Sequence, residues 1–336
     1  MLTVHSSAPG RIGILGNPSD IYGGKVLSMT IQFRAHVWVR RSEKFQVKTG
    51  FRQGTGPSSG ESQSLFSLIR ASNFRLIKEG WIDREEPMEV FIETRIPRES
   101  GMGGSAAIII AYLNACRKLL HLDFDDYRMA EMAQKIEHKD LGIVAGYNDR
   151  YCIVFGGLVF MDFTGKNVDR EVWEGEPYAK IRWIDGCDIP LVCGYLSIRR
   201  DSGSVHAPIR ERFLRGEREV VEAMKRLTKL TEEGEKAILR SDWDELADLM
   251  NENYEIAKKI GWAYPIDDEL RNMGLKNGAK AAKLGGAGKG GVMVFLASEK
   301  RRLLKLLKNA GVNAFIPKRS KGPNIELFKD ATKLLN

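Results

Sequence analysis

A glycine-rich stretch in the first half of the chain has the composition of an anion site. Residues 97–107 read PRESGMGGSAA and run directly into the apolar sequence IIIAYL. Glycine inside a helix costs roughly 1 kcal/mol relative to alanine, so these small residues must serve another purpose. A glycine loop that opens a helix lets backbone N–H groups and the positive end of the helix dipole approach a phosphate. The alternative for this stretch alone is a tight turn packed against a neighbouring element.

Two further loops rich in glycine and polar residues flank this stretch in the sequence. Residues 8–31 read APGRIGILGNPSDIYGGKVLSMTI, and residues 282–296 read AKLGGAGKGGVMVFL. A sugar is bound by several short polar groups that converge on it. The first of these loops offers Asn17, Ser19, Asp20 and Tyr22 for that purpose. The same residue types also stabilise turns, which is the structural alternative for each of them.

The composition indicates a globular protein of about two domains. Of the 336 residues, 43% are hydrophobic and 29% are charged, and the formal net charge is +8. Lys and Arg are mixed with Asp and Glu, without an accompanying aromatic platform, which argues against a nucleic-acid partner. The longest apolar run is shorter than the roughly 20 residues of a membrane span, and no signal-peptide pattern is present. We therefore expect no membrane partner and a cytoplasmic location, which the four unpatterned cysteines also suit.

Hydrophobic periodicity predicts the elements that must position these residues. We expect strands at residues 12–15, 26–33, 36–39, 45–48, 88–94, 151–155, 158–163, 190–197 and 291–296. We expect helices at residues 65–79, after the glycine stretch, at 129–138, across 205–260 and at 299–309. Ser241 predicts a helix start and Gly234 the end of the preceding helix. A shift of composition through residues 166–188 places the domain boundary, which gives domains at 1–187 and 188–336.

Taken together, the three loops resemble the motifs of the GHMP family of small-molecule kinases. Its members carry P-G-[KR]-x-x-x-x-G near the start, P-x-x-x-G-[LM]-[GS]-S-S-A-A in the middle and G-x-G-x-G-G near the end. The stretch at 97–107 fits the middle motif, with Gly104 where many members have serine. The segments GNPSDIYGG, HKDLGIVAGYNDR and FGGLVFMDF look like the glucuronokinase branch of the family, which lies near heptose kinases.

The resemblance implies an α+β fold of two domains. The first would be an ATP-binding domain of the ribosomal protein S5 domain 2 type, and the second a ferredoxin-like α/β domain with added helices. It also implies ATP- and Mg²⁺-dependent transfer of a phosphoryl group to a sugar hydroxyl, with the anomeric hydroxyl of a uronic acid such as glucuronate as the expected acceptor. Heptoses and other hexoses are the alternative acceptors, and a non-catalytic sugar or nucleotide sensor on the same fold is the alternative class.

The family's roles transfer to matching residues of this chain. Asp149 stands at the catalytic aspartate, which would orient or deprotonate the attacking hydroxyl. Arg11 stands beside it and would neutralise charge on the transferring phosphoryl group. Ser105 and Glu137 would hold Mg²⁺. Without the motifs, an Asp in a turn such as Asp149 or a Glu at a helix end such as Glu137 is most often a helix cap or a solvated charge.

The resemblance also indicates where the ligands would lie. The carboxylate of a uronic acid calls for a cation, for which Arg150, Arg199 and Arg200 are the candidates. Gly286 and Gly288 of the third loop would close over the phosphates or the sugar. The phosphates of ATP would lie against Pro97, Gly101, Met102, Gly103, Gly104, Ser105 and Ala106.

Overall fold

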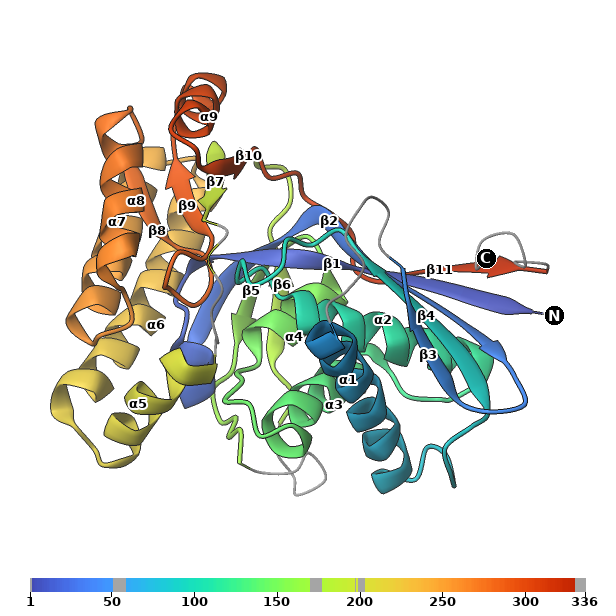
Figure 1. The fold of residues 1–336 in the computed structure, drawn as a ribbon. Helices are drawn as coiled ribbons and strands as arrows, with labels where there is room; N and C mark the ends of the chain where they lie inside the picture. The colour runs from blue at the N-terminus through green and yellow to red at the C-terminus, as the bar shows by residue number, and fades with distance from the viewer. Residues whose placement is uncertain (1, 51–58, 170–176, 197, 199–202, 330–336) are drawn as a thin grey trace.

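Two β-sheets form the framework of the fold (Figure 1). The computed structural model of the chain describes residues 2–50, 59–169, 177–196, 198 and 203–329. Its first sheet consists of β1 (Thr3–Leu15), β2 (Lys25–Arg41), β3 (Gln46–Thr49), β4 (Met88–Thr94), β5 (Leu158–Asp162), β6 (Lys180–Trp183) and β11 (Asn324–Phe328). Its second sheet consists of β7 (Leu191–Tyr195), β8 (Ala281–Leu284), β9 (Met293–Leu296) and β10 (Asn313–Phe315).

The long strand β2 organises the first sheet. It pairs antiparallel with β1 along most of its length, with β4 through residues 35–41 and with β5 through residues 25–29. Strand β11 pairs with the other edge of β1, so the end of the described chain returns to the first sheet. A division of the chain at residue 188 therefore leaves one strand of the first sheet in the second half.

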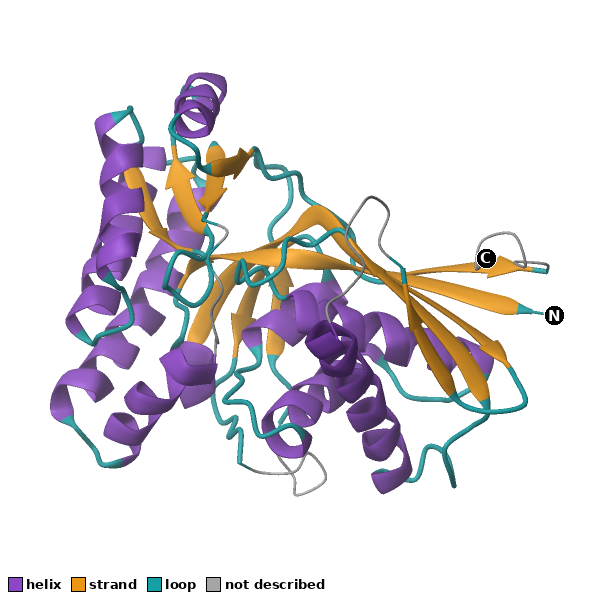
Figure 2. Ribbon diagram, in the orientation of Figure 1, coloured by secondary structure: helices purple, strands orange, loops and turns teal. Residues whose placement is uncertain are grey.

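One face of the first sheet is covered by helices (Figure 2). Helix α2 begins at the glycine stretch, packs on β1 and β2, and buries nearly all of its side chains. A helix that is apolar on every side is stable only inside a core, which explains the run of isoleucines that follows the glycines. The helices and turn on this face are α1 (Ser59–Lys78), α2 (Gly104–Leu119), α3 (Asp126–Lys135), the π-helical turn η2 (Ile136–Asp140) and α4 (Asn148–Phe155).

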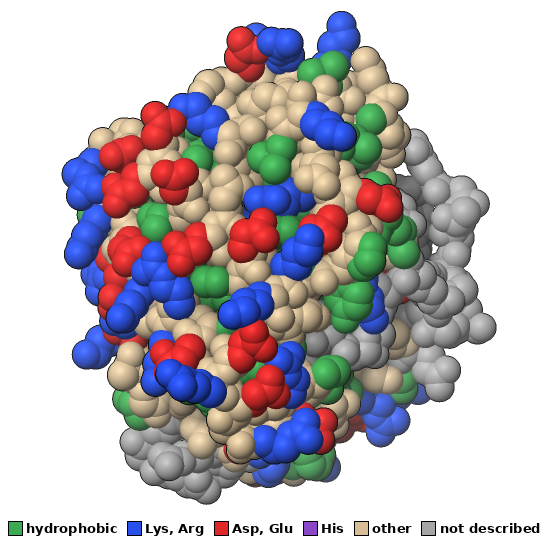
Figure 3. All heavy atoms as spheres, turned by 90° about the vertical axis from the view of Figure 1, so that its left-hand side faces the viewer, with side chains coloured by type: hydrophobic (Ala, Val, Ile, Leu, Met, Phe, Trp, Pro, Cys, Tyr) green, Lys and Arg blue, Asp and Glu red, His purple; other side chains and the backbone are tan. Residues whose placement is uncertain are grey.

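Apart from the short 3₁₀ helix η1 (Ser19–Tyr22), the remaining helices belong to the second half of the chain, where α6 also contacts β2 and so connects the two parts. On the side of the molecule that includes α7 and α8, Lys and Arg are interspersed with Asp and Glu (Figure 3). Arg226 with Glu252 at 2.6 Å is one of the ion pairs there. None of the helices in the described ranges is both long and apolar enough to span a membrane. The second-half helices are α5 (Gly203–Leu214), α6 (Arg218–Leu239), α7 (Trp243–Lys259), α8 (Pro265–Lys276) and α9 (Lys300–Asn309).

One predicted strand is wrong. Residues 151–155 form the body of helix α4, not the first strand of a hairpin, and Gly156 ends that helix with a positive φ of 65°. The aromatic and β-branched residues Tyr151, Ile153 and Val154 are all buried. A helix buried on all sides has no polar face, so its sequence is indistinguishable from a short buried strand.

Three smaller expectations also differ from the structure. The strands expected at 26–33 and 36–39 are one strand, β2, and the guanidinium of Arg34 between them donates to the carbonyls of Ser7 and Gly322. Asp242, not Ser241, caps α7 by accepting the N–H of Glu245 at 3.0 Å. Gly234 lies inside α6, where an added Cβ would come within 2.1 Å of a Leu15 methyl carbon, so it serves close packing rather than helix termination.

Candidate active site

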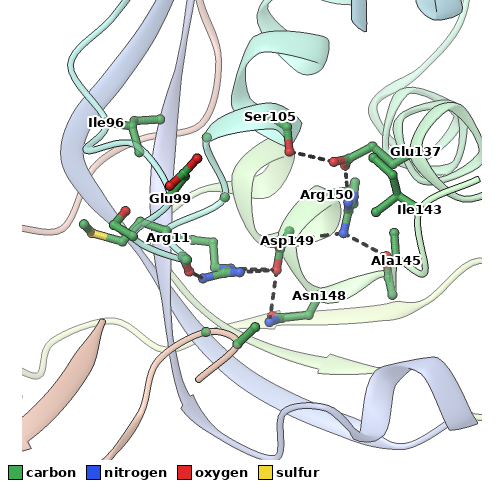
Figure 4. A pocket seen from close by; sticks show the side chains of 18 of the residues that line it. Arg11, Ile96, Glu99, Ser105, Glu137, Ile143, Ala145, Asn148, Asp149 and Arg150 are labelled. Carbon is green, nitrogen blue, oxygen red and sulfur yellow. Dashed lines mark hydrogen bonds and ion pairs between the residues drawn. The ribbon is translucent and has the colours of Figure 1, made fainter. Parts of the chain in front are cut away.

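The three glycine loops converge on one cavity of about 530 Å³. It lies where the end of β1, the starts of α2 and α4, and the loop after β8 meet (Figure 4). The loops are separated by up to 274 residues in the sequence, so only the tertiary fold brings them together. The predicted site residues that line the cavity are Arg11, Asn17, Asp20, Pro97, Gly101, Met102, Gly103, Gly104, Ser105, Glu137, Asp149, Arg150 and Gly286.

The middle loop presents the start of α2 to this cavity. Gly101 and Gly103 have φ values of 74° and 75°, which L-residues with a side chain rarely adopt. Gly103 is the N-cap of α2 and no side chain caps the helix. An added Cβ at Gly103 would lie 3.1 Å from a methyl carbon of Ile153 and 3.8 Å from a carboxylate oxygen of Asp149. The loop therefore offers uncapped N–H groups and the positive end of a buried helix dipole to a phosphate.

Arg11 and Asp149 form a charge-assisted pair at the wall of the cavity. Arg11 Nε donates to Asp149 Oδ1 at 2.7 Å, and Nη2 lies 2.6 Å from the same oxygen. Arg11 Nη1 also donates to the carbonyls of Gly101 and Gly285, one from each of the other two loops. Arg11 is only 5% exposed, whereas the side chain of Asp149 is 21% exposed. The arginine is thus fixed within the protein, and the carboxylate remains accessible to a ligand.

Asp20 controls the position of the helix that carries Asp149. Its Oδ2 accepts the backbone N–H groups of Tyr147 at 2.8 Å and Asn148 at 2.9 Å, at the start of α4. A carboxylate at this end complements the helix dipole. Burial raises the pKa of Asp20, and the two backbone hydrogen bonds oppose that rise. Gly146 permits this approach, since an added Cβ there would come within 2.0 Å of Asp20 Oδ2.

Ser105 and Glu137 are bonded to each other, and Glu137 is also bonded to Arg150, the residue after Asp149. Ser105 Oγ donates to Glu137 Oε1 at 2.6 Å, and the Arg150 guanidinium donates to Glu137 Oε2. Arg150 also donates to Gly146 O at 3.1 Å. Burial lowers the pKa of Arg150, but the carboxylates of Glu137 and Asp149 outweigh this and raise it overall. The result is a compact chain of polar contacts from α2 through Glu137 to the start of α4.

The hydroxyl of Ser105 and the carboxylate of Glu137 fit a magnesium ion. Both supply the hard oxygen ligands that Mg²⁺ prefers, and they face the cavity beside the uncapped start of α2. Within the described part of the chain, no cluster of three or more His, Cys, Asp or Glu could hold a metal ion by itself. Mg²⁺ commonly binds through one or two protein ligands and completes its shell with water and phosphate.

Four predicted site residues lie outside the cavity lining. Ser19 is buried and its hydroxyl donates to Lys25 O at 2.9 Å, while the Tyr22 ring packs against Phe213 with centroids 4.1 Å apart. Ala106 is buried within α2. At Gly288 an added Cβ would meet Asp267 at 2.5 Å, so this glycine packs onto the start of α8. The candidate arginines at positions 199 and 200 lie outside the described residues.

Three residues that shape the site escaped prediction. Trp262 lines the cavity from the second half of the chain. The buried Asp267 holds the third loop by accepting the N–H groups of Lys289 at 2.9 Å and Gly290 at 2.7 Å. Lys283 reaches from β8 to Asn17, where Nζ lies 2.7 Å from Oδ1. The available signal for Lys283 was a single charged residue within the apolar strand sequence that precedes the glycine loop.

Comparisons with known proteins agree with this arrangement. The family described as "GHMP kinases N terminal domain" matches residues 67–157, "GHMP kinases C terminal" matches 235–313, and a "galactokinase galactose-binding signature" matches 3–41. Glucuronokinase 1 of Arabidopsis thaliana is 31% identical over 89% of this chain and 86% of its own length. The D-glycero-alpha-D-manno-heptose 7-phosphate kinase of Campylobacter jejuni is 27% identical over 92% of this chain and 94% of its own.

A solved structure shares the fold at low sequence identity. Lactococcus lactis galactokinase in complex with galactose superposes with a TM-score of 0.76 at 15% identity, and the match covers 96% of this chain and 95% of that one. The expected two-domain α+β fold is therefore confirmed. On the strength of the family matches and the relative at 31% identity, the chain belongs to the GHMP kinases and is a phosphotransferase that acts on an alcohol group.

Proposed function

We propose that this GHMP kinase is a sugar kinase that uses ATP and Mg²⁺, and that its acceptor is the anomeric hydroxyl of a uronic acid such as D-glucuronate. The observation that carries the proposal is the accessible carboxylate of Asp149, held by Arg11 beside the uncapped start of α2 in one cavity. The identity of 31% with a glucuronokinase supports the choice of acceptor.

In the proposed reaction the chain contributes mainly position and charge. Backbone N–H groups at residues 103–106 hold the phosphates of ATP. Asp149 accepts the proton of the sugar hydroxyl, or a hydrogen bond from it, while that oxygen attacks the γ-phosphorus. Arg11 balances the charge that gathers between the attacking oxygen and the phosphoryl group. Such transfer needs no covalent enzyme intermediate, because alignment and electrostatic stabilisation carry most of the catalysis.

We propose that Ser105 and Glu137 hold Mg²⁺, which when bound would neutralise charge on the phosphate oxygens. The Glu137 carboxylate is already bonded to Ser105 and to Arg150. Metal binding would draw on these same oxygens, and Arg150 would then have a weaker hold on Glu137. Direct titration of Mg²⁺ and ATP by calorimetry, with Glu137→Gln as the comparison, measures this contribution independently of turnover.

A heptose or another neutral hexose is the second candidate acceptor. Two observations favour it: the 27% identity with a heptose kinase, and the fact that Arg11 and Arg150 are both already bonded to carboxylates. A uronate carboxylate would have to compete for Arg150 or find another partner.

A coupled assay of ADP release over a panel of acceptors tests the proposal. The panel contains D-glucuronate, its methyl ester, D-galacturonate, neutral hexoses, heptoses and mevalonate. We expect D-glucuronate to give the highest kcat/KM and its uncharged methyl ester to be a poorer substrate. ³¹P NMR of the product identifies the phosphorylated position. If only neutral sugars are phosphorylated, the acceptor is a heptose or another neutral hexose and not a uronic acid. If folded protein phosphorylates no sugar, the proposal of a sugar kinase is refuted.

A further inference from the structure

Lys283 is a buried cation that the proposed reaction does not use. It lies on β8, is 1% exposed, and is not part of the cavity lining. Its Nζ donates to Asn17 Oδ1 at 2.7 Å, to Gly13 O at 3.3 Å and to its neighbour's carbonyl, Leu284 O. A lysine ammonium has three donors, and these three acceptors match them in number. Burial of an ammonium is costly unless it is well bonded, so this group is specifically accommodated.

The ammonium dictates which way the Asn17 carboxamide points. Protonated lysine can only donate, so below the pKa of Lys283 the group that faces it must be the amide oxygen and not the amide nitrogen. The Asn17 nitrogen donates one hydrogen to Leu284 O at 3.4 Å, the carbonyl that also accepts from Lys283 Nζ, and its second hydrogen is available to a ligand. Asn17 lines the cavity next to Asp20. An amide held in this orientation offers an N–H donor to a ligand, whereas an amide free to rotate could offer either a donor or an acceptor.

The backbone of Gly13 packs closely against Asn17 and the third glycine loop. An added Cβ at Gly13 would lie 2.8 Å from Asn17 Oδ1 and 3.2 Å from Gly285 O. The N–H of Gly13 also donates to Gly285 O at 2.8 Å, which joins β1 to the third glycine loop. Lys283, Gly13 and Asn17 therefore form one junction between the two sheets, at the edge of the cavity.

We propose that Lys283 is a positioning residue that fixes the Asn17 carboxamide, so that the acceptor subsite presents an N–H donor to an oxygen of the sugar. This assignment rests on the proposed function only for the identity of the ligand as a sugar. The partner it selects is a hydrogen-bond acceptor, such as a carboxylate oxygen or a lone pair of a hydroxyl. Loss of Lys283 frees the amide to rotate and weakens that selection.

The test is a double-mutant cycle of Lys283→Met and Asn17→Ala, measured as KM for the sugar that the wild type uses best. Because Lys283 acts through Asn17, we expect each single variant to raise that KM about tenfold, and the double variant to equal Asn17→Ala alone. The KM for ATP should stay within about twofold, since the middle loop, which we propose holds the phosphates, is not part of the junction. Effects on the sugar KM that multiply in the double variant, or an equal rise of the KM for ATP, overturn the proposal.

Lys135→Met is the matched control. Lys135 is equally buried and donates to a backbone carbonyl, Val168 O at 3.2 Å, but it neither lines the cavity nor contacts Asn17. Its replacement tests what loss of a buried lysine does to the protein in general. We expect lower thermal stability with an unchanged KM for the sugar. A tenfold rise in the sugar KM of this variant would mean that the effect of Lys283→Met is not specific, and would overturn the proposal.

The same cycle separates this proposal from the proposed function. If the wild type turns over no sugar, the proposed function fails, and the cycle is then measured as free energies of urea unfolding. A non-additive double variant supports the bond between Lys283 and Asn17 and the orientation of the amide. An additive one shows that the two side chains are not coupled and overturns the proposal without any substrate.

Discussion

Lys283→Met should change how the stability of the protein depends on pH. Burial, together with the smaller effect of the Arg11 charge, lowers the pKa of Lys283 to about 7. In the unfolded chain the pKa of lysine is about 10.4. Between these two values the unfolded chain binds a proton that the folded chain does not, so the free energy of unfolding rises with pH. Below the folded pKa both states are protonated, and the full cost of burying the charge is present.

The size of the effect follows from the two pKa values. Each pH unit between them is worth up to about 1.4 kcal/mol for one group. Integrated from about pH 6 to about pH 9, the contribution of Lys283 to the free energy of unfolding rises by about 3 kcal/mol. Methionine has a similar length and no titrating group, so Lys283→Met lacks this contribution. Relative to the variant, the wild type should therefore become more stable by about 3 kcal/mol over this range.

Urea unfolding of both proteins at several pH values measures this difference. All other titrating groups are shared, so their contributions cancel when the variant is subtracted from the wild type. We also expect the slope of unfolding free energy against urea concentration to be the same for both, because neither the core nor the exposed area changes much. A stability difference that stays constant from about pH 6 to about pH 9 would refute the reasoning, since Lys283 would then have the same pKa folded and unfolded.

Three further predictions follow, two on the site and one on a buried ion pair between α1 and η2. Asp149→Asn should lower kcat by about 10²- to 10⁴-fold and leave the KM for ATP nearly unchanged; an equal change in both would argue against a catalytic carboxylate. In Gly286→Ala the new Cβ would lie 2.2 Å from Gly101 O of the middle loop, the proposed phosphate site, so the KM for ATP should rise. In Gly104→Ala the nearest protein atom is 3.7 Å from the new Cβ, so steady-state kinetics should show little change. Asp140→Asn should lower the free energy of unfolding by about 3 kcal/mol, because it removes the nearer of the two carboxylates, Asp140 and Glu79, that pair with the fully buried Arg75. A urea midpoint equal to that of the wild type would contradict this.

The parts of the candidate site that belong to short sequence motifs could be predicted from the sequence. The small residues of the middle loop follow from the need of a phosphate to reach the backbone, and the structure places them at the start of α2. Arg11 and Asp149 were predicted to be neighbours because each belongs to a recognisable motif, and they are 2.7 Å apart. Most strands and helices also followed from periodicity, since alternation and the helical repeat are properties of short segments.

What could not be predicted depends on contacts between distant segments. Asp20 was expected to bind sugar hydroxyls, and no local signal reveals that one of its oxygens caps a helix 127 residues later in the chain. The strand predicted at 151–155 failed for a related reason: burial on all sides is a tertiary property that removes the polar face of α4. A single lysine within an apolar strand usually reaches solvent, so the sequence does not predict that Lys283 is buried where β8 meets β1.

Arg11 explains why the three loops act as one site. Its guanidinium bonds at the same time to Gly101 of the middle loop, Gly285 of the third loop and Asp149 of α4. Glycine is favoured at both carbonyl positions: Gly101 has a positive φ of 74°, and at Gly285 an added Cβ would come within 2.7 Å of a Val294 methyl carbon. Any separation of the second sheet from β1 would remove the Gly285 acceptor from Arg11, while its bonds to Gly101 and Asp149 lie within the first half of the chain. The arginine beside the proposed catalytic carboxylate is therefore one of the groups that connect the two halves of the chain.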